Sequence, residues 1–150
     1  MKTGNFLTAL IMLLSFVAIS ANAQNETTFG KKEDAIEKHN EYVYNHAKAM
    51  EKAIAEADQG FNPKSYMKHA REIRKHATKS KAYVNKLQKE RSSVKKSETK
   101  FNKTIEHYDN ILQEEFQVEK ELGMPASDRH KLASHVSIIL DEIEAVKKDI

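Results

Sequence analysis

Glycine and proline are scarce in this chain, and their positions limit where long helices can begin and end. The sequence has four glycines and two prolines in 150 residues, and neither type occurs within residues 64–122. The stretch Gly60-Phe61-Asn62-Pro63 can close one helix and open the next, because glycine adopts the left-handed conformation that ends a helix. Asparagine is a good N-cap, and proline suits the first helical position, where its missing N–H would be unpaired anyway. A second break at residues 123–127 (Gly-Met-Pro-Ala-Ser) supports helical segments joined by short turns, with Ser127 as the next N-cap.

Apolar residues recur at helical spacing in four stretches. The run 91–97 is poor in core residues and rich in serine, which favours turns over helix interiors, so one long helix over residues 64–122 is rejected. The first helix is expected at about 33–59, and the others lie between the breaks. The expected core positions are Ile36, Val43, Ala47, Met50, Ile54 and Ala57; Met67, Ala70, Ile73, Ala77, Ser80, Val84, Leu87 and Val94; Phe101, Ile105, Tyr108, Leu112, Phe116 and Leu122, with Ile111 and Val118 alongside; and Leu132, Val136, Ile139, Leu140, Ile143, Val146 and Ile150.

Four amphipathic helices of similar length indicate an all-α fold. Short turns between them predict an up-down-up-down four-helix bundle over residues 33–150. The last helix has the cleanest apolar face and is expected to complete the core. A helical hairpin pair that dimerises is the alternative.

The first residues predict export. Lys2 is followed by an almost wholly apolar run over residues 6–19, and Ala21-Asn22-Ala23 fits the small-x-small cleavage rule. Residues 1–23 are therefore predicted to be a signal peptide and residues 24–32 a disordered lead-in, so the protein would be periplasmic or secreted. The apolar run is short for a membrane span and no comparable run follows, so no transmembrane span is expected after cleavage. A retained N-terminal anchor is the alternative.

The chain has no cysteine. An exported protein of this kind must be stabilised by packing rather than by disulfides, and thiol catalysis, thiolate metal sites and covalent haem attachment are excluded. The sequence also lacks a glycine-rich phosphate loop, Gly-x-Ser-x-Gly and His-Glu-x-x-His, so no enzymatic activity is expected. The signal and composition resemble those of small exported helical proteins of Gram-negative bacteria.

Seven histidines are the first candidate functional feature. His39 and His46 are seven residues apart, as are His69 and His76, so each pair shares one helix face. Two imidazoles that face each other are the beginning of a transition-metal or bis-histidine haem site.

A hairpin centred on the first break would place His46 opposite His76 and His39 opposite Tyr83, with His107 about one turn away. His46, His76 and His107 are therefore the expected ligands of an alternative metal or haem site. The carboxylate–histidine motif of di-iron bundles is missing, and histidines beside an apolar stripe are usually half-buried and hydrogen-bonded. The rings of His46 and His76 are thus expected to be partly exposed and to bind metal weakly if at all.

Charge segregation is the second candidate feature. Residues 64–103 carry 14 Lys or Arg against three Glu, whereas residues 104–150 carry five basic and 11 acidic residues. The basic helix can simply complement acidic neighbours, or it can bind phosphate-rich lipid headgroups or another polyanion. Nucleic acid is not expected, because no recognition motif accompanies the charge. The candidate polyanion-binding residues, called the basic strip below, are Lys64, Lys68, Arg71, Lys75, Lys79, Lys86 and Lys89.

Two functional hypotheses follow. The preferred one is an exported, non-enzymatic helical-bundle binding or structural module of the bacterial cell envelope, without a cofactor. It would act through an unknown envelope protein or through the anionic envelope surface. The alternative is a metal- or haem-binding four-helix bundle that uses histidines of the first hairpin.

Overall fold

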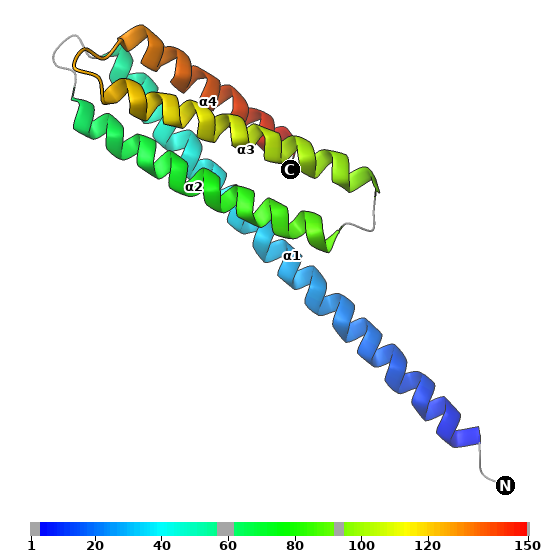
Figure 1. Ribbon diagram of the computed structural model, residues 1–150. Coiled ribbons are helices and arrows are strands. Elements are labelled where there is room, and N and C mark those ends of the chain that lie inside the picture. The colour runs from blue at the N-terminus through cyan, green and yellow to red at the C-terminus, as the bar shows by residue number, and fades with distance from the viewer. Residues whose placement is uncertain (1–3, 57–61, 92–94, 150) are drawn as a thin grey trace. The chain divides into compact units, whose positions relative to one another are not determined.

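The chain is helical, without strands, in the part that the structure describes. The computed structural model describes residues 4–56, 62–91 and 95–149. It contains α1 (Gly4–Ala55), α2 (Pro63–Glu90), α3 (Lys95–Leu122) and α4 (Arg129–Asp149) (Figure 1). The predicted all-α class with four helices is confirmed. None of these helices, over the described residues, combines the length and the apolar character that a membrane crossing requires.

Contacts divide the chain into two units. The first unit, residues 1–34, contains the beginning of α1, and the second, residues 35–150, contains its remainder together with α2, α3 and α4. α1 ends at Ala55, earlier than expected, and residues 57–61 of the predicted hinge lie outside the described part. The signal peptide and the disordered lead-in concern the exported chain and stay predictions.

α2 begins at the residue that the sequence predicted, but its first turn is not capped by the predicted side chain. Pro63 occupies the first turn and Asn62 is the N-cap residue, yet the Asn62 side chain makes no capping hydrogen bond. An N-cap residue whose side chain accepts from the first N–H groups of the helix usually has a ψ in the β region, at about 100–180°. The ψ of Asn62 is 89°, just below this range. The Asn62 carbonyl oxygen instead accepts from the N–H groups of Ser65 at 3.1 Å and Tyr66 at 3.4 Å.

At the remaining helix ends, the two predicted breaks between helices are confirmed and the predicted N-cap residue of α4 is wrong. α2 ends at Glu90 and α3 begins at Lys95, so the serine-rich run separates two helices, although residues 92–94 lie outside the described part. α4 is capped by Asp128 rather than by Ser127, because the Asp128 Oδ1 accepts from the N–H of His130 at 2.9 Å. Backbone hydrogen bonds to this carboxylate, the one from Lys131 first, lower the pKa of Asp128.

The core of the second unit consists of one stripe from each helix. Those of α1, α2 and α4 follow the predicted positions with one exception in α2, where Tyr66 is buried and the expected Met67 is half-buried. Residues 57, 94 and 150 lie outside the described side chains. The buried apolar residues are Ile36, Val43, Ala47, Met50 and Ile54 in α1; Tyr66, Ala70, Ile73, Ala77, Val84 and Leu87 in α2; Tyr108, Ile111, Val118 and Leu122 in α3; and Leu132, Val136, Ile139, Leu140, Ile143 and Val146 in α4.

The predicted stripe of α3 was wrong at four positions. Its buried residues follow steps of four and three from Thr104 to Leu122, and this face includes Glu115. Thr104 can be buried because its hydroxyl donates to the carbonyl oxygen of Lys100 at 3.0 Å. The four apolar residues lie at the edge of the core or outside it: Phe101, Ile105 and Leu112 are half-buried, and Phe116 is 57% exposed.

Glu115 is a fully buried carboxyl that packs between α2 and α3. The Arg74 Nε donates to the Glu115 Oε2 at 2.7 Å, and the Arg74 Nη2 donates to the Glu119 Oε2 at 2.6 Å. The other Glu115 oxygen has no hydrogen-bond partner among the described residues. Burial raises the pKa of Glu115 to about 7, with Arg74 acting in the opposite direction and Glu119 adding to the rise.

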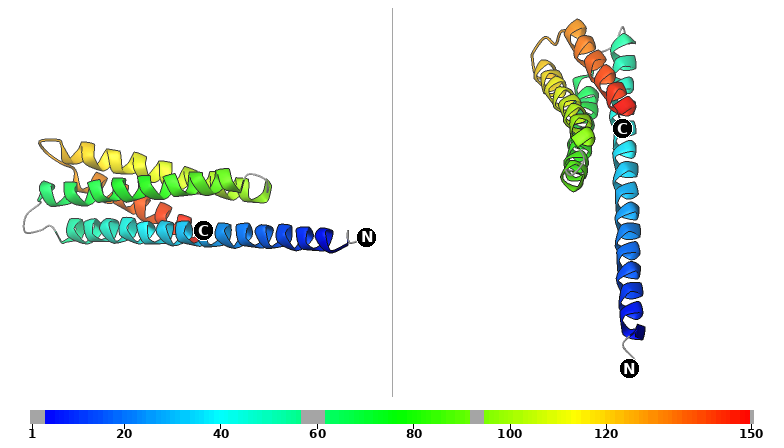
Figure 2. Two further views of the ribbon diagram at one scale, coloured as in Figure 1. Left: turned by 90° about the horizontal axis from the view of Figure 1, so that it is seen from below. Right: turned by 90° about the vertical axis from the view of Figure 1, so that its right-hand side faces the viewer.

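Asn40 connects three helices inside the core. Its Oδ1 accepts from the Ser80 hydroxyl at 3.1 Å and from the Tyr108 hydroxyl at 2.6 Å. The three side chains come from α1, α2 and α3, and all are buried; Figure 2 shows these helices from two further sides. Burial raises the pKa of Tyr108 to about 12, so the phenol remains a hydrogen-bond donor at neutral pH.

Candidate functional site

Four histidines form two pairs where α1 meets α2. The Nδ1 atoms of His39 and His76 are 2.8 Å apart, and those of His46 and His69 are 2.9 Å apart. Numbers rise along α1 and fall along α2, so the two helices run in opposite directions here. In each neutral pair one ring donates its Nδ1–H and the other accepts at Nδ1.

The pairing differs from the expected one. His46 faces His69 rather than His76, whereas His39 does approach Tyr83, with ring centroids 6.1 Å apart and planes tilted by 20°. The helix ends at Ala55 and Pro63 contribute to this difference, because they shift the centre of the hairpin to lower numbers.

The histidine rings have unequal environments. His76 is buried, which contradicts its expected partial exposure, while His39, His46 and His69 are half-buried. Burial is the main cause that lowers the pKa of His39, His69 and His76. Nearby positive charge adds to it, from Lys79 at His39 and from the partner imidazole at His69 and His76.

His76 makes two further contacts that fix its ring. The Tyr42 ring stacks on it, with centroids 4.4 Å apart and planes at 26°. The Glu72 Oε2 lies 3.4 Å from its Nε2 and also accepts from the Lys75 Nζ at 2.7 Å. The hydrogen bond from Lys75 is the first cause that lowers the pKa of Glu72. Glu72 therefore presents a carboxylate to the ring nitrogen that does not face His39.

His107, the third expected ligand, has partners in another part of the fold. Its Nδ1 lies 2.5 Å from the Glu142 Oε2, and its Nε2 lies 3.5 Å from the Asp149 Oδ2. The three histidines proposed as one ligand set thus have different partners. Over the described residues, no group of three or more His, Asp or Glu side chains is arranged to hold a metal ion.

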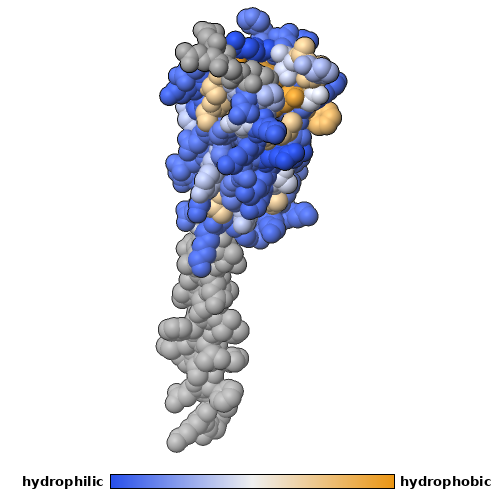
Figure 3. Space-filling model, turned by 90° about the vertical axis from the view of Figure 1, so that its left-hand side faces the viewer, coloured by the Kyte–Doolittle hydropathy of each residue, from blue (hydrophilic) through white to orange (hydrophobic). Residues whose placement is uncertain are grey.

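All seven residues of the basic strip are exposed along one face of α2. Arg71 lies 4.0 Å from Glu119, Lys75 pairs with Glu72, and the Lys86 Nζ lies over the Tyr83 ring. Lys64, Lys68 and Lys79 have no carboxylate partner among the described residues. In the described part of the face in Figure 3, hydrophilic residues predominate and apolar ones are scattered.

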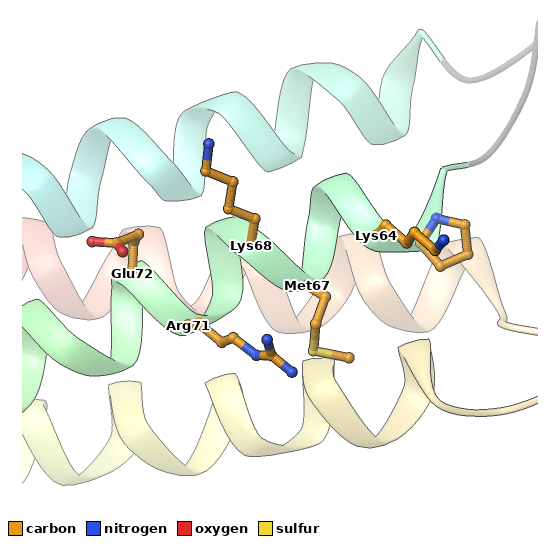
Figure 4. Close-up of a pocket in the computed structure, with 6 residues that line it drawn as sticks. Lys64, Met67, Lys68, Arg71 and Glu72 are labelled. Atoms are coloured by element: carbon orange, nitrogen blue, oxygen red, sulfur yellow. The ribbon is translucent and has the colours of Figure 1, made fainter.

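The first turns of α2 border a surface hollow of about 410 Å³. It is lined by Pro63, Lys64, Met67, Lys68, Arg71 and Glu72. In Figure 4 the Lys68 side chain extends toward α1, whereas Arg71 and Met67 extend toward α3. The hollow therefore combines three cations of the basic strip and the Glu72 carboxylate with the apolar surface of Pro63 and Met67.

Sequence reasoning missed His39 and His69 as direct histidine partners, and it missed Met67 beside the basic strip. Both histidines belong to the seven-residue pairs noted in the sequence. A hairpin centred at a lower residue number would have paired His39 with His76 and His46 with His69. No family model, curated protein or solved structure matches the chain.

Proposed function

We propose that the chain is an exported, non-enzymatic helical binding module of the bacterial cell envelope. Residues 1–23 are cleaved on export, and the four helices form an up-down-up-down bundle. Bonded side chains support this topology, because in each successive pair of helices their numbers rise along one helix and fall along the next. The non-catalytic role rests on the sequence, which carries none of the catalytic motifs considered above.

The basic strip is the proposed binding face, and anionic lipid headgroups are its proposed ligand. The observation that carries this proposal is the exposed charge of Lys64, Lys68 and Lys79, which no carboxylate within the described residues neutralises. Each lysine near an anionic membrane surface contributes about 1 kcal/mol of attraction. Pro63 and Met67 add apolar surface beside these cations, as an amphipathic ligand requires.

Vesicle co-sedimentation tests the proposal. Wild-type protein should bind vesicles that contain anionic phospholipid at low salt, release them at high salt and ignore vesicles of neutral lipid, because salt screens exposed charges. Replacing Lys64, Lys68 and Lys79 with glutamate should abolish binding while the helical circular dichroism is retained.

A matched control has the same change in net charge on other helices. Lys120, Lys131 and Lys148 are exposed residues of α3 and α4, and their replacement with glutamate should leave most of the binding intact. Equal loss in both triple variants would show that total charge, and not the basic strip, is responsible. Wild-type protein that ignores anionic vesicles at low salt would refute the proposal, since screening cannot then be the reason.

A further inference from the structure

We propose that His39 and His76 form a two-nitrogen site for a copper(II)-type divalent ion, and that His46 and His69 form a second such site. Both sites lie along the contact between α1 and α2. This inference goes beyond the proposed membrane binding and does not depend on it. It also replaces the ligand set expected from the sequence, because His107 contacts Glu142 and Asp149 instead.

The distances within the pairs match the spacing of neighbouring ligands on one ion. Two nitrogens bound at about 2.0–2.1 Å and at a right angle are about 2.9 Å apart, whereas a tetrahedral angle separates them by about 3.4 Å. The observed Nδ1–Nδ1 distances are 2.8 Å for His39 with His76 and 2.9 Å for His46 with His69. The ring centroids, 4.9 Å and 5.2 Å apart, show that the two Nδ1 atoms of each pair point almost directly at each other, as in a hydrogen bond. An ion in square-planar or tetragonal coordination therefore replaces each hydrogen bond only after both rings turn, so that their Nδ1 lone pairs point at the ion.

Glu72 gives the first site a supporting partner. Its Oε2 lies 3.4 Å from the His76 Nε2, which favours a proton on that nitrogen and leaves the Nδ1 lone pair free to face His39. Metal-bound histidines commonly have such a carboxylate on the second ring nitrogen. When the ion binds, the proton between the two Nδ1 atoms moves to the Nε2 of its own ring through solvent, so the neutral pair releases no net proton.

The composition of the sites selects the kind of ion. Imidazole nitrogen suits copper, nickel and zinc, whereas magnesium and calcium require oxygen ligands. Positive charge from Lys79 and Lys38 near His39 opposes all divalent cations alike. Selectivity therefore comes from the intrinsic affinity for nitrogen ligands, which is highest for copper(II). Water completes the coordination, because the described residues supply no third ligand. Haem fits less well, since two imidazoles on opposite sides of its iron hold their nitrogens roughly 4 Å apart.

Titration of the untagged protein with copper chloride tests the inference. Calorimetry at neutral pH should show two ions bound per chain, and electron paramagnetic resonance should show splitting from two nitrogen ligands at each. His39→Gln should remove one ion and His46→Gln the other, while glutamine keeps a hydrogen-bonding side chain in each pair. Glu72→Gln should weaken the first site by about 10–100-fold.

The exposed His130 provides the control for adventitious binding, and His130→Gln should leave both sites unchanged. Circular dichroism and thermal unfolding of each variant would separate a lost ligand from a lost fold. Copper binding that persists in a folded His39→Gln/His46→Gln double variant would overturn the inference. So would wild-type binding no tighter than that of this double variant.

Discussion

Replacing Glu115 with glutamine should stabilise the protein at alkaline pH and change it little at acidic pH. The carboxyl is fully buried, and only one of its oxygens has a described hydrogen-bond partner, Arg74. Burial penalises the ionised form, and glutamine has the same shape without the charge. The loss of the ionic bond to Arg74 is limited, because Arg74 also pairs with Glu119.

The pKa of Glu115 gives the size of the effect. It is raised from 4.5 to about 7, so the folded protein binds this proton more tightly than the unfolded chain does. Stability therefore falls as pH rises from the unfolded pKa through the folded one. Integrating the two titrations between pH 5 and pH 8 gives a loss of about 2.5 kcal/mol that the glutamine variant should not show.

Urea unfolding of both proteins from pH 5 to pH 8 would measure this difference. The comparison cancels the contribution of every other titratable group, because both proteins contain the same ones. Glu106→Gln removes the same charge from an exposed position of α3 and should not change the pH dependence. A free-energy difference between wild type and Glu115→Gln that stays constant with pH would refute the reasoning, because the carboxylate would then be ionised throughout.

Three further predictions concern processing and the core. Mass spectrometry of the exported protein should find Gln24 as the first residue, and a chain that keeps residues 1–23 would contradict the predicted cleavage. Ile139→Ala should lower the free energy of unfolding by about 2–5 kcal/mol, because Ile139 is fully buried in α4; a loss below about 1 kcal/mol in urea unfolding would show that α4 is not part of the core. Tyr108→Phe should cost about 1 kcal/mol through the lost bond to Asn40, and an unchanged urea midpoint would argue against that bond.

The sequence predicted the core where residue type and spacing agree. In α1, α2 and α4 the apolar residues themselves recur at helical steps, so the predicted stripes were correct apart from Met67, in whose place Tyr66 is buried. In α3 the buried face includes Thr104 and Glu115, while Phe116 lies outside. The burial of Glu115 depends on Arg74 from α2, and no pattern within α3 alone reveals a partner on another helix.

Only part of the candidate site was predicted, again because contacts between helices do not follow from the pattern within one helix. Seven-residue spacing placed the histidines on shared faces, which depends only on helix geometry. Their partners depend on where the hairpin is centred, and this does not follow from the residues of the turn. The exposure of the basic strip was predictable because lysines with few acidic neighbours rarely become buried.

The amide of Asn40 has a consequence for how the helices are aligned along their axes. The buried alanines Ala47, Ala70 and Ala77 have the same small side chain and make similar contacts. A helix displaced along its axis by one turn, about 5.4 Å, would therefore still have acceptable apolar neighbours. Such a slip would separate Asn40 from Ser80 and Tyr108 and leave polar groups unpaired in the interior, at about 1–3 kcal/mol each. Replacing all three with apolar residues of similar size should thus preserve stability while permitting several shifted packings, because the two hydrogen bonds to Asn40 select one alignment for the three helices.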